Sequence, residues 1–478
     1  MNKNSLKENL IFQGLYQIIR IITPIITIPI ISRAFGPSGV GVTSFSFTIV
    51  QYFLMFSGLG IQLYFNRLIA ENDESKTQLS KTFWNIFMSK AILSVVVLLL
   101  YIITIHCFIT EYRLIFYLQG VFIVGSFFDI SWYYAGMERF KLPSIINMLM
   151  SMLVLIVVVG FVHDQSDMAL YVFVIAAITV FNQIPLYFNV FKEISFITID
   201  WQEVWTILKT SFAYFLPNGQ LNLFTSINCL IIGLMMSYKD VGIFANTFNI
   251  LTVAIILINT IDLVMIPRLT RITREHNHSI QRILENNMHI QLMLTIPMVF
   301  GIIAIMPDFY QWFFGKAFYE SVPLMTVLSI LLLIIPLNMM ISRQYLLSQN
   351  MVKSYNLSLI AGGILNIICS IVLVLPFGLY GIGLARIVAE LMILIWRWID
   401  IRKLNIVLDY RNIIKALCAS AVMYLSIMLV AHYLHHPVIT TFIEIMTGIM
   451  LYLVCNLILR NKYLLIVLNG ILRRERSS

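Results

Sequence analysis

An arginine lies in the middle of the first membrane-length apolar run of the chain. The run reads YQIIRIITPIITIPIIS over residues 16–32, and Arg20 is its one charged side chain. Polar or helix-bending residues recur at helical spacing here: Gln13, Gln17, Arg20 and Pro24. An α-helix would carry them along one face. Because a charge deep in a bilayer is costly, such a stripe is typical of a helix that lines a wet cavity.

The chemistry of Arg20 favours an anionic partner. A guanidinium is always charged, and its planar fork of donors suits phosphate. The apolar segment at 208–236 carries Asn218 and Asn222 in similar register and is without a charge at mid-span. We therefore predict an anion-binding cavity that is polar on two walls and cationic on one. The alternative is an ion pair within the membrane, between Arg20 and Asp129 or another acid.

Other charged side chains also fall inside expected spans, where they are functional candidates by default. They are Lys90, Asp129, Asp262, Arg386, Glu390 and Glu444. Lys90 and Asp262 lie near the inner ends of their spans, where a side chain can reach water. Arg386 and Glu390 are four residues apart on one helix and can form a structural pair. Asp129, Asp262 and Glu390 are candidate protonation or sodium sites.

The composition indicates an integral membrane protein. The chain has 478 residues, of which 59% are hydrophobic and 12% charged, with a mean hydropathy of +0.88. Since a helical span takes roughly 20 apolar residues, we expect about fourteen spans and an all-α fold. Approximate spans are 10–32, 41–63, 84–106, 113–136, 142–162, 168–190, 208–236, 241–266, 287–306, 323–341, 355–376, 379–400, 414–434 and 439–459.

The distribution of charge predicts the orientation of the chain. Of the 32 Lys and Arg residues, those in segments expected outside are Arg33, Arg113, Lys239 and Lys316, whereas most of the others fall in segments expected inside. By the positive-inside rule, both termini are cytoplasmic. The net charge of +9 therefore indicates membrane topology and not a nucleic-acid partner. The first span shows no cleavage pattern, so we expect it to be retained.

An internal repeat predicts two lobes. VGVTSFSFTIV at Val40 recurs as VGIFANTFNIL at Val241, with Gly41 and Gly242 among the identical pairs. The copies are six spans apart, so they have the same orientation in the membrane. We expect an N-lobe at 1–191, an amphipathic inner-surface linker at 192–207, a C-lobe at 208–403, and two further helices with a basic cytoplasmic tail at 404–478.

The sequence contains little that points to catalysis. It lacks a phosphate-binding loop of the GxxxxGK[ST] type, and Gly315–Lys316 has the wrong neighbours. The histidines at 432, 435 and 436 lie at an outer helix end, where they do not predict a metal site. Short loops leave no room for a soluble catalytic domain. We expect a protein that is not an enzyme and has no cofactor.

Four motifs resemble those of Wzx-type polysaccharide flippases of the multidrug/oligosaccharidyl-lipid/polysaccharide exporter superfamily. They are SRAFGPSGVG at Ser32, DISWYYAGMERFK at Asp129, FGKAFYESVPLMTVLS at Phe314 and GLYGIGLARIVAE at Gly378. The resemblance covers nearly the whole chain, including the paired six-helix lobes. It implies alternating-access translocation of an undecaprenyl-pyrophosphate-linked oligosaccharide from the inner to the outer leaflet of the bacterial cytoplasmic membrane.

The resemblance also implies a site and partners. A cationic cavity would hold the pyrophosphate, with Arg20 in that role, Arg67 at the inner mouth, and Gln17, Asn218 and Asn222 beside them. Partners would be the lipid-linked oligosaccharide, membrane lipids, and a polymerase or other polysaccharide-assembly proteins, with the chain itself a monomer. The alternatives are a multidrug or cation antiporter, which predicts an acidic cavity, and a membrane polysaccharide polymerase, which predicts a large outer loop.

Overall fold

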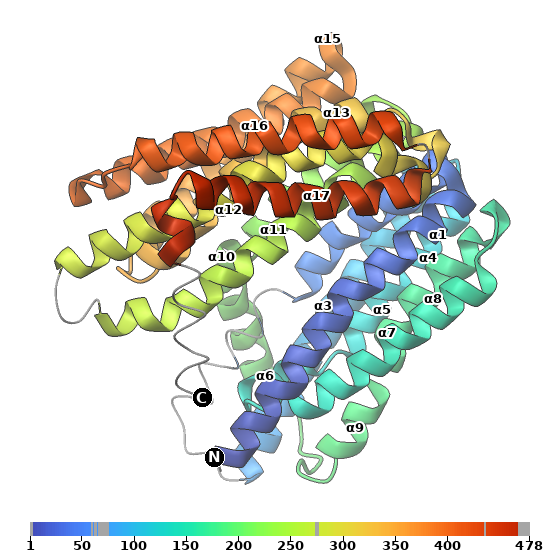
Figure 1. Cartoon of the computed structure of the whole chain (residues 1–478). Helices are drawn as coiled ribbons and strands as arrows, with labels where there is room; N and C mark the ends of the chain where they lie inside the picture. Colours follow the sequence, from blue (N-terminus) through green and yellow to red (C-terminus); the bar gives the residue numbers. More distant parts are fainter. Residues whose placement is uncertain are drawn as a thin grey trace. The chain divides into compact units, whose positions relative to one another are not determined.

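The computed structural model in Figure 1 is built almost entirely of helices. It describes residues 3–58, 61, 65, 76–272, 277–434 and 436–466, and the side chains of these residues except 3–7, 10, 212–225, 259–272 and 277–280. The chain divides into two compact units, Met1–Gly242 and Ile243–Ser478, which are described separately below. The lobe boundaries expected from the sequence stay predictions.

The described part of the first unit contains ten helices and the first turn of another. They are α1 (Lys3–Gly58), α3 (Lys76–Phe108), α4 (Arg113–Gln119), α5 (Val121–Phe128), α6 (Ser131–Gly136), α7 (Lys141–Phe161), η1 (Gln165–Asp167), α8 (Met168–Phe181), α9 (Ile184–Val190) and α10 (Trp201–Met235), followed by the start of α11 (Tyr238–Ile272). Since α10 begins at Trp201, the second half of the expected linker is continuous with the next span.

Among the residues that the structure describes, the second unit contains the rest of α11 and nine further helices. They are α12 (Asn277–Phe313), η2 (Lys316–Phe318), α13 (Ser321–Leu328), α14 (Leu331–Ile341), the π-helix η3 (Ser342–Leu346), α15 (Val352–Ile401), η4 (Arg402–Leu404), α16 (Tyr410–Tyr433) and α17 (Pro437–Ile458).

The expectation of an all-helical membrane protein is confirmed. In the described part of the chain, 10 helical segments are long and apolar enough to cross a membrane, and Arg113–Phe128 and Ser226–Met235 are shorter apolar helices. Two of the long segments each combine two expected spans. They bend at Gly36 (φ 62°) and Gly378 (φ 55°), conformations that glycine adopts readily. Each expected span therefore has a helical counterpart.

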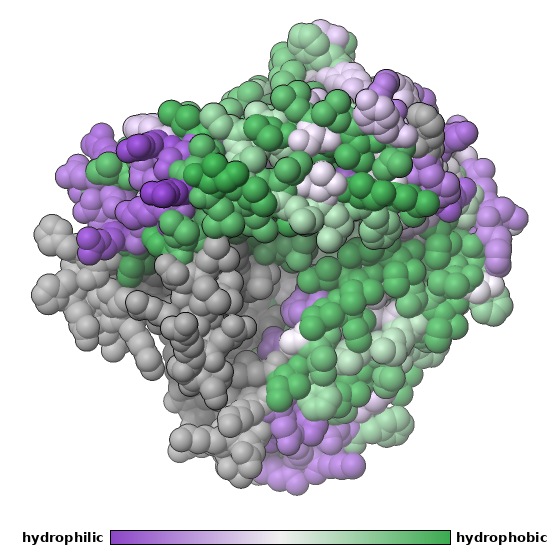
Figure 2. Space-filling model, in the orientation of Figure 1, coloured by the Kyte–Doolittle hydropathy of each residue, from purple (hydrophilic) through white to green (hydrophobic). Residues whose placement is uncertain are grey.

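The surface of the helices is suited to lipid. Large apolar side chains are exposed along α17, such as Phe442, Met446 and Met450, while Glu444 and Asn456 on its other face are buried. Figure 2 shows apolar side chains over the middle of α16 and α17, and separately over α1 and α7, with polar side chains toward the helix ends. This arrangement is the reverse of a water-soluble surface, and the protein is a multi-pass membrane protein.

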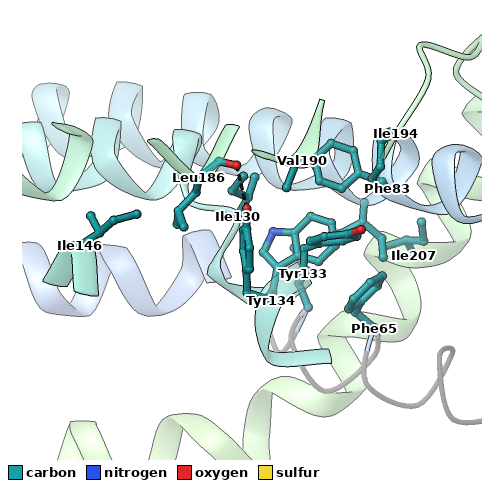
Figure 3. Close-up of a cluster of buried hydrophobic side chains, with 13 residues drawn as sticks. Phe65, Phe83, Ile130, Tyr133, Tyr134, Ile146, Leu186, Val190, Ile194 and Ile207 are labelled. Atoms are coloured by element: carbon teal, nitrogen blue, oxygen red, sulfur yellow. Dashed lines mark hydrogen bonds between the residues drawn. The ribbon is translucent and has the colours of Figure 1, made fainter. Parts of the chain in front are cut away.

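An aromatic cluster forms the core of the first unit near the turn between α5 and α7. Phe83 of α3, Trp132, Tyr133 and Tyr134 of α6, and Phe65 are all at most 3% exposed. In Figure 3 the rings of Tyr133, Tyr134 and Phe65 lie below Leu186 and Val190 of α9. The Tyr134 hydroxyl donates to the carbonyl oxygen of Leu186 at 2.8 Å. Packing of this kind holds the short helix α6 against α3 and α9.

Two repeat-related glycines bring α1 and the start of α11 into backbone contact. A Cβ atom on Gly41 would overlap the carbonyl oxygen of Tyr238, and one on Gly242 would overlap the carbonyl oxygen of Pro37. The contact is reciprocal, because each glycine meets the residue four positions before the other. Only glycine leaves room for it.

Substitution of Gly41 by alanine tests this contact. We expect Gly41→Ala to lower the stability of the purified protein by about 1–3 kcal/mol, because a methyl group would force the two backbones apart. Thermal unfolding in detergent measures the effect. Gly14→Ala is the matched control on the same helix, since a Cβ there would meet nothing within 4 Å. Equal melting temperatures for the two variants would contradict the interpretation.

Candidate functional site

Arg20 lies on the half of α1 that packs against α7. The buried face of this half includes Asn9, which donates to the carbonyl oxygen of Glu138 at 3.0 Å and accepts from the amide of Lys141 at 3.0 Å. Arg20 and Gln17 are both exposed. Within the described residues, no carboxylate forms an ion pair with Arg20. The helix is thus anchored near its start, and its mid-span guanidinium further along is exposed.

Asp129, the acid weighed as a partner for Arg20, pairs instead with Lys90 of α3. The Lys90 ammonium donates to the Asp129 carboxylate and also to the carbonyl oxygen of Asp129 at 2.9 Å. The Lys90 side chain is 5% exposed and that of Asp129 is 33% exposed. Lys90 therefore does not reach out to water at the end of its span, as its position suggested, but ends at the partly exposed carboxylate of Asp129.

Side chains from other helices satisfy the backbone where α5 ends and α6 begins. The Tyr187 hydroxyl donates to the carbonyl oxygen of Phe128 at 2.8 Å, the Trp132 indole donates to that of Asp129 at 3.1 Å, and Gln183 accepts from the amide of Ile130 at 3.1 Å. A helix break within the membrane requires such partners, because hydrocarbon provides none. Gln183 and Tyr187 were not predicted from the sequence, although a glutamine inside an apolar span indicates a polar contact between helices.

A second polar cluster joins the inner end of α3 to the start of α10. Lys81 lies 3.1 Å from Asp200 and 3.3 Å from Glu203, and Asn85 donates to Glu203 at 2.9 Å. Asp200 caps α10 by accepting from the amides of Gln202 and Glu203. The hydrogen bonds from Lys81 and from the Glu203 amide hold the pKa of Asp200 below its ordinary value. These contacts tie the expected linker to the first unit.

In the second unit, Arg386 and Glu390 form a buried ion pair on α15. The Arg386 Nη2 atom lies 2.7 Å from Glu390 Oε1, with side chains 5% and 8% exposed. Asn338 of α14 donates to Glu390 Oε2 at 2.8 Å, and Arg397 donates to the carbonyl oxygen of Asn338 at 2.9 Å. Asn338 and Arg397 were not predicted from the sequence, because each of these hydrogen bonds joins α14 to α15.

The remaining site predictions cannot be placed. Arg67 lies outside the described residues, and so do the side chains of Asn218, Asn222 and Asp262. Of the expected phosphate-binding set, Arg20 and Gln17 are described, and both are exposed on one helix. Their role and that of Asp129, Arg386 and Glu390 stay predictions.

Comparison with known sequences decides the family. Residues 6–273 match the model of the family described as "Polysaccharide biosynthesis protein". The chain belongs to this polysaccharide biosynthesis protein family. A curated relative, the "Putative O-antigen transporter" of Escherichia coli strain K12, is 23% identical over 399 residues, which are 82% of this chain and 95% of the relative.

Solved structures share the fold of this family member. The lipid II flippase MurJ in an inward closed conformation matches with a TM-score of 0.72 and 15% identity, over 95% of this chain and 98% of MurJ. An inward-facing multidrug resistance transporter of the MATE family matches with a TM-score of 0.61 and 16% identity, over 80% of this chain and 95% of that chain. At these identities the similarity concerns the fold alone.

Removal of one partner from the Lys90–Asp129 pair should destabilise this protein. We expect Asp129→Ala to lower the free energy of unfolding by about 3 kcal/mol, because it leaves a buried ammonium without a counter-charge. The double variant Lys90→Met with Asp129→Asn should recover much of the loss, since neither residue is then charged. Thermal unfolding of the two variants measures the difference. A double variant less stable than Asp129→Ala would show that the pair does not act as a unit.

Proposed function

We propose that the chain is a flippase that moves an undecaprenyl-pyrophosphate-linked oligosaccharide from the inner to the outer leaflet of the bacterial cytoplasmic membrane. The observation that carries the proposal is an exposed arginine, Arg20, at mid-span in a member of a polysaccharide biosynthesis family. The names of the curated relative and of MurJ, an O-antigen transporter and a lipid II flippase, support the same class of cargo.

The chemistry of the cargo explains the position of the arginine. A glycan that entered hydrocarbon would lose its hydrogen bonds to water at a large cost in free energy, so the head group needs a polar path. The polyprenyl tail is apolar and can stay in the lipid. Arg20 would bind the pyrophosphate through paired hydrogen bonds that are shorter and stronger than those of neutral groups. The exposed Gln17, one turn earlier on α1, would add a donor to the same anion. Arg67, Asn218 and Asn222 complete the proposed site.

The proposal includes a driving force and partners. The chain lacks a phosphate-binding loop, so we infer that an ion gradient or removal of the product by later enzymes drives transport. Those later enzymes would include a polymerase that receives the unit in the outer leaflet. We infer that a single chain forms the complete path.

The structure gives less support to cation export, the alternative suggested by the MATE fold. A cationic drug needs a carboxylate that is free to receive it. Asp129 is paired with Lys90, and Glu390 is paired with Arg386 and receives a hydrogen bond from Asn338. The charged group that the described residues leave open at mid-span on α1 is a cation, which repels such a drug.

Substitution of Arg20 tests the proposed site. We expect Arg20→Ala to reduce polymer export by about tenfold or more, because a charge-assisted hydrogen bond to phosphate contributes about 1.5–3 kcal/mol. Arg20→Lys should restore only part of the activity, since an ammonium keeps the charge and loses the fork. Surface polymer per cell, normalised to the amount of flippase in the membrane, is the measurement.

Arg411→Ala is the matched control, because Arg411 is an exposed arginine at the start of α16. Normal export by a stable Arg20→Ala protein would overturn the assignment of this residue. Depletion of the protein should also cause a lipid-linked oligosaccharide to accumulate on the inner leaflet. Loss of drug efflux without such accumulation would instead establish the antiporter.

A further inference from the structure

A carboxyl group in the second unit is buried without an N–H or hydroxyl donor. Glu444 lies in α17 at 0% exposure, and neither of its carboxyl oxygens accepts a hydrogen bond from an amide or hydroxyl group of the described residues. Thr440, one turn earlier on the same face of α17, is also 0% exposed, and its hydroxyl likewise has no partner there. Two adjacent polar groups therefore point into a helix interface that does not satisfy them.

A second acid faces Glu444 from the neighbouring helix. Asp308 of α12 is half-buried, and its carboxyl group is the main electrostatic neighbour of Glu444. The two helices are joined beside this pair, because the Trp312 indole of α12 donates to the Thr441 hydroxyl of α17 at 3.0 Å. The acids are thus brought together by a defined contact between α12 and α17.

The third helix packed at this interface adds no titratable group close to the pair. The α16 residues that lie against Gly448, one turn beyond Glu444, are Ile427 and Met423, which are apolar. The titratable residues at this end of α16, His432 and Tyr433, are exposed. On α12, Tyr310 interacts with Asp308, and within the described chain no cation interacts with either acid. The described residues therefore do not balance the negative charge of the pair.

The energetics of this arrangement favour one bound proton. Two carboxylates next to each other repel, and a buried carboxylate without a donor has lost its hydration with nothing in return. A proton on Glu444 removes the charge from the buried position. Asp308, which is half-buried, keeps contact with the surroundings through which a proton can enter or leave.

We propose that Asp308 and Glu444 form a proton-binding site between α12 and α17, with the proton held on Glu444 and exchanged through Asp308. No bond other than the O–H bond forms or breaks, and the proton comes from water. Separation of α12 from α17 would expose Glu444 and release the proton. Use of this proton to drive transport rests on the flippase function proposed above.

Infrared spectroscopy of the purified full-length protein tests the proton directly. At neutral pH the wild type should show the carbonyl stretch of a protonated carboxylic acid, and the band should disappear in Glu444→Gln. Asp308→Asn should retain the band and shift its position, because the acid next to it has gone. Glu320→Gln is the control, since Glu320 is an exposed carboxylate of the same unit and should leave the band unchanged.

Absence of the band in the wild type, or its persistence in Glu444→Gln, would overturn the proposal. A second measurement does not depend on the band. As the pH rises above about 4.3, the pKa of a free glutamic acid, the melting temperature of the wild type should fall until Glu444 itself is deprotonated, because the unfolded state releases a proton that the folded state retains. Glu444→Gln should remove this part of the pH dependence, and an unchanged profile would also contradict the site.

The coupling role has its own readout. If the proton drives transport, Glu444→Gln should reduce polymer export while leaving the Arg20-dependent binding of cargo in place, and full export by this variant would exclude coupling. The spectroscopic result does not depend on the cargo. A protein with the predicted band but no effect on polymer export upon depletion would therefore refute the flippase function and leave the proton site intact.

Discussion

The need to pair every polar group inside hydrocarbon determines much of this structure. An unsatisfied backbone or side-chain group there costs several kcal/mol, so an interruption of a helix needs side chains to replace its lost hydrogen bonds. The break between α5 and α6 shows how this is done. Lys90 from α3, and Gln183 and Tyr187 from the α8–α9 segment, each bind a backbone group at the break. Two segments are thereby fixed by three side chains around one short stretch of non-helical chain.

A second constraint is the close approach of two repeat-related glycines within the first unit. Gly41 and Gly242 are equivalent positions in the repeat, and each lies against the backbone of the residue four before the other. Because the contact is reciprocal, a side chain at either position would disrupt both halves of it. The presence of glycine at both positions thus has a steric reason. The sequence repeat rests on few identities, and one of them, Gly41 and Gly242, corresponds to a contact in the structure.

The parts of the molecule that could be predicted from the sequence are those that depend on one helix at a time. Hydropathy locates the spans, and Arg386 and Glu390 are four residues apart, so their pairing follows from helical spacing. Pairing across helices does not follow from spacing. Lys90 and Asp129 are distant in the sequence, and periodicity within each span says nothing about which helix lies opposite. The interpretation of Asp129 as a partner for Arg20 was open for the same reason.

Arg20 and Glu444 both lie inside spans without an opposite charge among the described residues, and their chemistry leads to different requirements. Arginine cannot lose its proton in a protein, so Arg20 keeps its charge and needs water or an anion. A glutamic acid can become neutral, so Glu444 can be buried completely if it takes up a proton. The exposure of the two side chains agrees with this difference, because Arg20 is exposed and Glu444 is not. An exposed cation at mid-span suits an anionic cargo that arrives and leaves, whereas an enclosed acid suits a proton that is held there and released when the helices separate.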